Sequence, residues 1–382
     1  MIKFHTGRIG LSVVLLMFTT CLSAQTSFKP KYNNSAFYTG IEVGSKGVKL
    51  SIVEIGKDAQ AQGAFNILKD SSVNTDFISF TPATFSATLD GLQSLYNTAV
   101  IKYDIPPSNI YTVISSGVKT IAEKDSKMSW IDKLIDSFRI KIKEPKRKVE
   151  VISVEDEARL SHLGIVPDSR RYNTFIIDIG SGNTKGGFFP YGNTKDFKLF
   201  QLGWGTKSTA NAAEKRLADD NTLSNYNKQL FKVLSSAENS EIIYAVNASG
   251  SYPLSDNIAF SGGIAWATAT LIRPEMIDNA VVSITYEEMA KFCTKLYLTH
   301  SLLTDDMLLM NMKENTKNKA ALAKEIKRVH SVFDQRSLMA GAGLLLKIMR
   351  QFASAYETKQ FYLVKNGQVG WISAYVDKSV DQ

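Results

Sequence analysis

The chain has 382 residues, 44% of them hydrophobic and 21% charged, and its formal net charge is +8. At ~150 residues per domain, this length predicts two domains. The basic balance favours an anionic partner. There is, however, no basic helix with interleaved aromatic residues, which argues against a nucleic-acid partner.

The first 25 residues, MIKFHTGRIGLSVVLLMFTTCLSAQ, have the pattern of a secretory signal peptide. Lys3 and Arg8 provide the basic start, residues 9–20 form an apolar run, and small residues end at Ala24. We expect a signal peptide over residues 1–24, cleavage after Ala24 and a periplasmic or secreted protein. The alternative is a lipid on Cys21. No later stretch is apolar over the ~18 residues that a membrane helix needs, so no membrane span is expected.

After the leader, strands and helices alternate, which predicts α/β layers. We place the first domain at residues 25–168 and the second at residues 169–382. The first is expected to contain strands near 38–44, 48–55, 63–68, 110–115 and 149–152, with helices near 83–102, 128–138 and 154–163. The second is expected to begin with the hairpin of TFIIDIG and TKGGFFP (174–180 and 184–190), and to contain strands near 197–202, 360–364 and 368–376, with helices near 206–218, 223–236, 285–299, 316–333 and 336–356. NIAFSGGIAWATATLI (257–272) is expected to form a strand, a Ser-Gly-Gly turn and a helix.

One short motif occurs twice, once near the start of each predicted domain. Residues 41–49 read IEVGSKGVK and residues 177–185 read IDIGSGNTK. The two copies share four residues, Ile41 and Ile177, Gly44 and Gly180, Ser45 and Ser181, Lys49 and Lys185. Glu42 in the first copy corresponds to Asp178 in the second, and each motif lies between two apolar strands. The chain therefore contains two strand–acid–Gly-Ser loop–strand units.

Two such loops facing each other would form a phosphate clamp, because backbone N–H groups free of side-chain bulk point at the anion. The simpler alternative is a pair of tight hairpin turns. The candidate phosphate-binding residues are Gly44, Ser45, Lys46, Gly180, Ser181, Gly182, Asn183 and Lys185. The carboxylates of Glu42 and Asp178 are candidate ligands for Mg²⁺, a cation that prefers oxygen.

Several ordered pieces of the chain resemble the exopolyphosphatase and guanosine pentaphosphate phosphatase (Ppx/GppA) family, within the actin, sugar kinase and Hsp70 fold superfamily. They are GIEVGSKGVKLSIVEI, VISSGVKTIAE, EVISVEDEARLSHLGIV, FIIDIGSGNTKGG, QLGWGTKS, FSGGIAWATATLI, RSLMAGAGLLLKIMRQF and FYLVKNGQVGWISAYV. The resemblance covers residues 38–375. It implies two ribonuclease H-like (actin-like ATPase) domains with a cleft between them, a helix near 336–356 that returns toward the first domain, and a closing hairpin.

The resemblance also implies hydrolysis of phosphoanhydrides by water, with a glutamate as general base. Matching ISVEDEARL to the family's catalytic helix places this base at Glu157, with Asp156 as the neighbouring candidate. The alternative is that Glu155, Asp156 and Glu157 only favour the positive end of a helix. His162, on the same helix, is interpreted as structural.

Three departures from the family pattern affect this reading. Glu42 stands where the family has aspartate, Lys46 where it has asparagine, and Lys185 where it has an acid implicated in metal binding. Two hypotheses follow: a hydrolase acting on polyphosphate or a nucleotide polyphosphate, or a binding and regulatory protein that keeps the clamp without turnover. A kinase is disfavoured because ATP is scarce outside the cytoplasm. Whether the protein forms a homodimer stays open.

Overall fold

The computed structural model describes residues 28–45, 47–56, 65–310, 312, 318–353 and 357–380. The predicted signal peptide, with Cys21 and the cleavage site after Ala24, lies outside the described residues, and so does Lys46. Within these ranges, the helices are all too short or too polar to cross a membrane.

Two mixed sheets form the framework. The first has the order β3-β2-β1-β4-β5 and the second the order β10-β11-β9-β6-β7-β8. The strands are β1 (Ser35–Gly44), β2 (Gly47–Gly56), β3 (Phe65–Asn74), β4 (Ile110–Ile114), β5 (Glu150–Val151), β6 (Thr174–Ile179), β7 (Thr184–Phe188), β8 (Lys198–Leu202), β9 (Asn257–Ser261), β10 (Val281–Ile284) and β11 (Gln360–Val364).

The two sheets repeat one topology. In the first, β1, β2 and β3 form an antiparallel meander, and β4 and then β5 add in parallel beside β1. In the second, β6, β7 and β8 form the meander, and β9 and then β11 add in parallel beside β6. The sequence repeat is therefore the local sign of a repeated architecture, and the predicted two-domain α/β fold is confirmed.

Helices cover both sheets. The α-helices are α2 (Pro82–Asn97), α3 (Ser116–Lys124), α4 (Met128–Lys141), α5 (Val154–Ile165), α6 (Thr206–Glu214), α7 (Leu223–Ala237), α8 (Ile243–Ser249), α9 (Gly263–Ile272), α10 (Tyr286–Leu298), α11 (Asp305–Met310), α12 (Lys319–Val332), α13 (Gln335–Arg350) and α14 (Gly370–Val380), and two π-helical turns, η2 (Thr98–Lys102) and η5 (Glu238–Ile242), follow α2 and α7.

Local sequence explains where several helices begin. Thr81 caps α2 in a reciprocal box with Thr84, and Pro82 occupies the first helical position, where its missing N–H costs nothing. Thr285 and Glu288 form the same kind of box at the start of α10. These signals agree with the apolar periodicity, so the boundaries of both helices were predictable.

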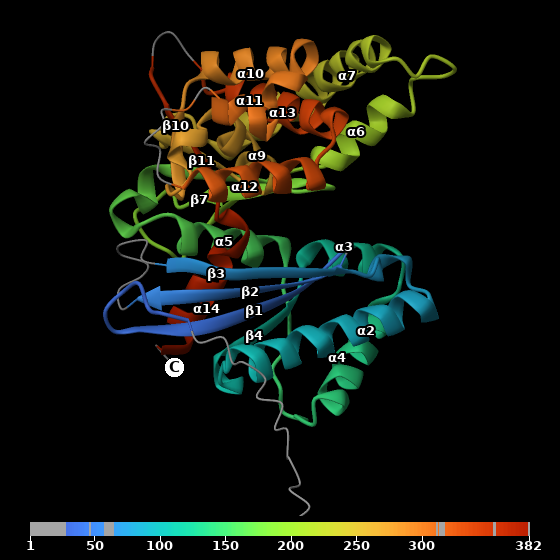
Figure 1. Ribbon diagram of the computed structural model, residues 1–382, viewed down its shortest axis with the longest axis vertical. Helices are drawn as coiled ribbons and strands as arrows, with labels where there is room; N and C mark the ends of the chain where they lie inside the picture. The colour runs from blue at the N-terminus through green and yellow to red at the C-terminus, as the bar shows by residue number, and fades with distance from the viewer. Residues whose placement is uncertain are drawn as a thin grey trace, which may run out of the picture.

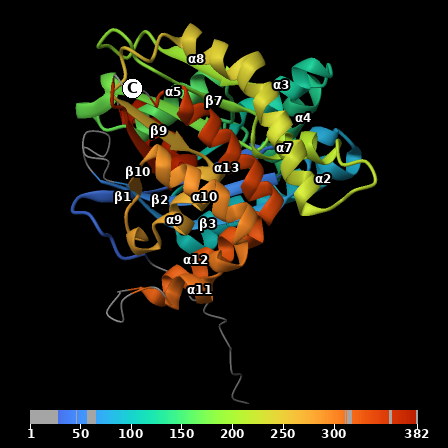
Figure 2. The ribbon, with the colours of Figure 1, turned by 90° about the horizontal axis from the view of Figure 1, so that it is seen from above.

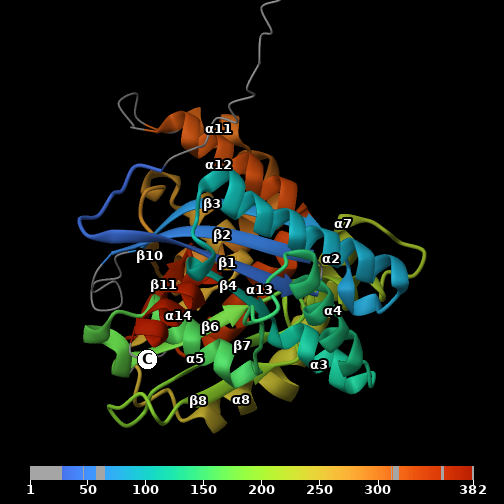
Figure 3. The same ribbon diagram turned by 90° about the horizontal axis from the view of Figure 1, so that it is seen from below.

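The first sheet lies in the lower half of Figure 1 and the second sheet in the upper half, with α5 between them. Seen from below, α2 and α4 flank the first sheet (Figure 3), where their apolar residues join those of β1 and β2 in one core. Seen from above, α13 lies among α7, α9 and α10 (Figure 2), and these helices share the core of the second sheet.

The end of the chain differs from the prediction. The segment expected as a strand at 368–376 is helical and forms α14, so the closing hairpin is wrong. The helix expected near 336–356 to return toward the first domain is α13, and its contacts are with α6, α7, α9 and α10 of the second domain. The returning element is α14, which packs on α5 and β1.

A separate apolar cluster forms where α14 meets the first sheet. Trp371, Ile372 and Tyr375 of α14 pack with residues of β2, β4 and α5, including Val53 and Leu160. Two glycines allow α14 and α5 to approach closely: a Cβ at Gly164 would lie 1.7 Å from the carbonyl oxygen of Gly370. The helix that carries Glu157 is therefore held in place by the last helix of the chain.

Candidate functional site

The two repeated motifs form two tight β-hairpins. Gly44 pairs with Gly47 across the first turn, and Gly180 N–H donates to the Asn183 carbonyl across the second at 3.0 Å. A hairpin backbone agrees with both interpretations of these loops, the simple turn and the phosphate clamp. Phosphate binding by these loops stays a prediction.

In both hairpins the strand acid lies directly across from the shared lysine. Glu42 pairs in register with Lys49, and Asp178 pairs with Lys185. The hairpins also interact electrostatically with each other, since Lys49 acts on Asp178 and Glu42 acts on Lys185. The structure therefore joins the two motifs into one cluster of charges between the sheets.

The parallel strands bring two serine–glycine turns to the same place. β4 ends beside β1, and β9 ends beside β6, where Asp178 and Ser261 are register partners. The Ser261 hydroxyl donates to Asp178 Oδ1 at 3.0 Å. Gly262 follows with φ 93°, and a Cβ there would lie 2.9 Å from the same oxygen. Only glycine fits a left-handed position this close to the carboxylate.

α5 brings Glu157 to these turns. Ser153 caps the helix by accepting the Asp156 N–H at 3.0 Å, and its hydroxyl donates to the Asp156 carboxylate at 2.7 Å. Glu155 and Asp156 are exposed, whereas only 13% of the Glu157 side chain is. Of the three acids, Glu157 alone lies where Ser116 of α3 and Lys185 of β7 meet, a place that we call the junction. Asp156 is therefore a poor alternative for the general base.

Both oxygens of the Glu157 carboxylate have partners. Oε1 accepts from the Lys185 ammonium at 2.5 Å, and Oε2 accepts from the Ser116 N–H at 3.0 Å. Ser116 is the first residue of α3, in the first domain, and Lys185 lies on β7, in the second. Glu157 therefore connects the two domains through a pair of charge-assisted hydrogen bonds.

The surroundings set the charge of each group. Burial opposes ionisation of Glu157, but the Lys185 ammonium outweighs it and lowers the pKa of this carboxyl. Burial likewise opposes the charge of Lys185, and the carboxylates of Glu157 and Asp178 reverse that effect and raise its pKa. For Asp178 burial dominates and raises the pKa. Glu157 is thus a stabilised anion and, for that reason, a weak base.

These residues do not fit a divalent cation. Mg²⁺ prefers a shell of oxygen ligands. Here the Lys185 ammonium lies among the three carboxylates that could supply it, those of Glu42, Asp178 and Glu157. Throughout the part of the chain that the structure describes, no group of three or more His, Cys, Asp or Glu side chains could hold a metal ion. Assignment of Glu42 and Asp178 as metal ligands therefore lacks support.

The second loop rests on the start of α6. The Gly180 carbonyl accepts the Thr206 N–H at 2.9 Å, and the Ser181 carbonyl accepts the Lys207 N–H at 2.8 Å. Gly205 permits this approach, since a Cβ there would lie 2.6 Å from the Asn183 nitrogen. The loop is fixed through its carbonyl groups, which leaves the exposed Ser181 and Gly182 on its outer side.

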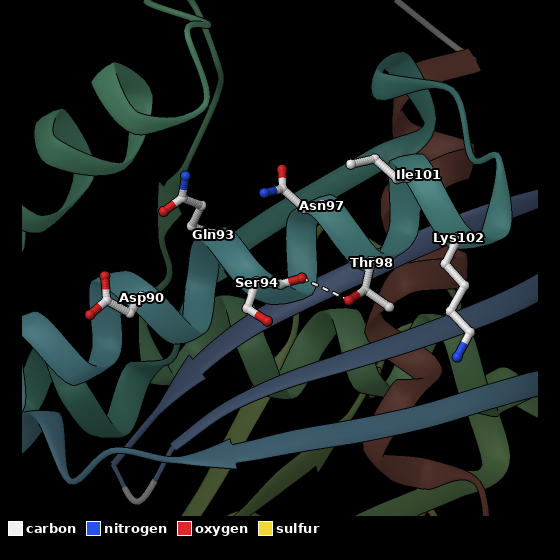
Figure 4. A pocket seen from close by; sticks show the side chains of 7 residues that line it. All are labelled: Asp90, Gln93, Ser94, Asn97, Thr98, Ile101 and Lys102. Atoms are coloured by element: carbon white, nitrogen blue, oxygen red, sulfur yellow. Dashed lines mark hydrogen bonds between the residues drawn. The ribbon is translucent and has the colours of Figure 1, made fainter. Parts of the chain in front are cut away.

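Two hollows on the surface lie away from the Glu157–Lys185 pair. The larger, of about 590 Å³, is an open groove along α2 and η2 (Figure 4), lined by Asp90, Gln93, Ser94, Asn97, Thr98, Ile101 and Lys102. The Thr98 hydroxyl bonds the Ser94 carbonyl of its own helix. The smaller, of about 290 Å³, is lined by β5, α5 and α14.

Sequence reasoning identified Glu157, Lys185, Asp178 and Glu42, and the structure brings all four together. It missed Ser116 and Ser261. The signal for these two is topological: each lies where a strand parallel to a motif strand gives way to a helix, and each is followed by a glycine. The pieces VISSGVK and AFSGGIA carry this pattern.

The sequence matches no protein-family model and no curated protein sequence. Solved structures do match. The Ppx/GppA family member of Aquifex aeolicus has a TM-score of 0.61 at 18% identity, over 90% of this chain and 99% of that one. The chain has the Ppx/GppA fold.

Two further structures with the Ppx/GppA fold agree. An exopolyphosphatase from Cytophaga hutchinsonii has a TM-score of 0.52 at 13% identity, over 91% of this chain and 98% of that one. An exopolyphosphatase-like protein has a TM-score of 0.56 at 14% identity, over 92% and 100%. The likeness extends along nearly the whole of each chain, so the Ppx/GppA fold describes both domains together.

Proposed function

We propose that this protein binds a phosphate-bearing anion at the junction of its two domains, without metal, and has lost efficient hydrolysis. The observation that carries the proposal is the ion pair between Lys185 and Glu157, 2.5 Å long. The fold is one whose solved examples are described as phosphatases and exopolyphosphatases, which supports a polyphosphate or nucleotide polyphosphate as the ligand.

The ion pair affects binding and catalysis in opposite ways. An ammonium in the junction attracts phosphoryl oxygens and replaces part of the charge that Mg²⁺ would supply. A general base, in contrast, works best when its pKa lies near the working pH. The pKa of Glu157 is lowered, and its carboxylate is bonded on both oxygens. Glu157 is therefore poorly prepared to take a proton from water.

The hydrolase remains the second candidate, because one observation favours it. Glu157 is the only acid of the first turn of α5 that lies in the junction, as expected for the general base of the family. A substrate that drew Lys185 away would free this carboxylate. The two candidates differ in a measurable way, namely whether phosphate is released.

The test measures binding and turnover on the same protein. Tripolyphosphate binding is followed by calorimetry in EDTA, and phosphate release from polyphosphate is followed with and without Mg²⁺. We expect binding in EDTA and no release above the buffer blank. In Lys185→Glu, which restores an acid, binding should become dependent on Mg²⁺. Mg²⁺-dependent release by the wild type, lowered ~10²–10⁴-fold in Glu157→Gln as for loss of a positioned base, would establish the hydrolase instead.

A further inference from the structure

The carboxylate of Glu157 lies where two donors from different domains converge. The Ser116 N–H belongs to the first turn of α3, whose preceding residue, Ser115, makes no side-chain capping bond. The Lys185 ammonium reaches the other oxygen of the same carboxylate from β7. A helix N-terminus and an ammonium both favour a negative charge. The structure satisfies them with a side chain of its own.

A further donor lies at this place. Ser116 is 1% exposed, and its buried hydroxyl lies close enough to the Glu157 carboxylate to help lower the pKa of that group, but it makes no well-formed hydrogen bond among the residues that the structure describes. A carboxylate has two oxygens, and here both are already bonded. A terminal phosphoryl group has three acceptor oxygens. It could therefore accept from the Ser116 N–H, the Ser116 hydroxyl and Lys185 together.

We infer that the Glu157 carboxylate is a built-in competitor of the phosphate ligand: the anion binds by displacing Glu157 from Ser116 and Lys185. This inference rests on the proposed function, because it concerns the same site. Displacement breaks the two bonds by which Glu157 of α5 now joins Ser116 of α3 and Lys185 of β7. Binding of the anion is thereby coupled to the connection between the two domains.

The competition has a measurable consequence. To bind, the anion must first break two charge-assisted hydrogen bonds, so its affinity is lower than the donors alone would allow. Removing the carboxylate relieves this cost. We expect Glu157→Ala to bind tripolyphosphate about tenfold or more tightly than the wild type, the scale set by a hydrogen bond to a charged group. Glu157→Gln, which keeps the size of the side chain, should change in the same direction if Glu157→Ala folds poorly.

Loss of a negative charge near an anion strengthens binding even without displacement, so a charge control is needed. Glu42→Gln removes one carboxylate that acts on Lys185 but touches neither Ser116 nor the ion pair among the contacts described. Its gain in affinity should be clearly smaller than that of Glu157→Gln. Glu155→Ala, an exposed acid in the same helical turn, should leave the affinity unchanged.

Calorimetry on these variants in EDTA, with tripolyphosphate as the probe, separates the outcomes. Tighter binding in the Glu157 variants alone, with a shift of the Ser116 amide resonance on adding ligand to the wild type, supports displacement. Equal gains in Glu42→Gln and Glu157→Gln, or no gain in either, overturn it while the proposed function stands. Absence of binding in every variant overturns both.

Discussion

Lys185 holds its ammonium between carboxylates that would otherwise repel one another. Only 11% of its side chain is exposed, against 13% for Glu157. Removing one partner of a nearly buried ion pair leaves the other charge unpaired, which costs several kcal/mol. At the scale of single residues, this lysine therefore stabilises the fold as well as the site.

The first prediction concerns Lys185→Met. We expect this change to lower the free energy of unfolding by about 3 kcal/mol, because Glu157 then lacks its buried counter-ion. The double variant Lys185→Met with Glu157→Gln should recover part of the loss. Urea unfolding of the wild type, the single variant and the double variant measures the free energy of unfolding of each. Lys119→Met is the control, since the pair of Lys119 with Glu123 is 3.9 Å long and its side chains are 30% and 55% exposed; the change should cost about 0.5 kcal/mol or less.

The second prediction concerns pH and His162. Its Nε2 is 3.0 Å from the Thr174 carbonyl oxygen, and burial lowers the pKa of this imidazole to about 4. As pH falls from about 6.5 to 4, the unfolded chain takes up a proton that the folded chain refuses, so stability decreases. For a pKa lowered this far, the loss of unfolding free energy at pH 4 approaches about 3 kcal/mol.

His162→Gln keeps an amide donor but cannot titrate. Its free energy of unfolding should therefore fall less than that of the wild type between pH 7 and pH 4, measured by urea unfolding at each pH. Parallel curves for the two proteins would mean that His162 is protonated in the folded state. The interpretation of His162 as structural depends on this comparison.

Sequence reasoning reached the residues of the site but not their contacts. The repeat and the family resemblance single out Glu157 and Lys185, and the exchange of an acid for Lys185 already indicates a change at the metal site. That the two side chains bond each other depends on the packing of α5 against β7, which no local pattern encodes. The Ser116 contact uses a backbone N–H, which every residue except proline has, and so it leaves no signal in the residue type.

At the scale of elements, α14 shows where periodicity fails. Its first seven residues are all buried. A run of seven buried residues has no polar face to reveal a 3.6-residue period, so it resembles a buried strand. The strands β6 and β7, in contrast, are separated by a glycine-rich turn, and their bounds agree with the prediction.

The third prediction concerns the crossing of α5 and α14. In Gly164→Ala, the added methyl would meet the Gly370 carbonyl oxygen at 1.7 Å, so one backbone must move. We expect a loss of about 3 kcal/mol or more in unfolding free energy, the upper range for overpacking. Gly182→Ala is the matched control, because nothing lies within 4 Å of the added atom. Equal stability of the two variants in urea would show that the helices do not cross this closely.

At the scale of the whole molecule, two kinds of contact among the described residues join the domains in addition to the bonds of Glu157 with Ser116 and Lys185. The first is the buried cluster around α5 and α14. The second is a partly exposed ion pair, in which Arg328 of α12 is 3.4 Å from Asp70 of β3 and the two side chains are 45% and 21% exposed. Exposed pairs contribute little. The buried cluster should therefore dominate the coupling between the domains.

The fourth prediction tests this ranking. Asp70→Asn should change the free energy of unfolding by less than about 1 kcal/mol, because solvent screens the pair with Arg328. Measurement in low and high salt adds a check, since only a surface pair weakens with ionic strength. If Asp70→Asn lowered the free energy of unfolding as much as Lys185→Met does, the pair of Asp70 with Arg328 would carry the coupling between the domains.

The position of α14 has a consequence for the order of folding. Val53 and Val113 of the first sheet find part of their apolar surroundings in Trp371 and Ile372, almost at the other end of the chain. A ribosome adds about 5–20 residues per second, so this face of the first sheet stays partly uncovered for roughly 15–60 s of synthesis. During that time the nascent first domain exposes apolar surface that α14 covers once it has been made.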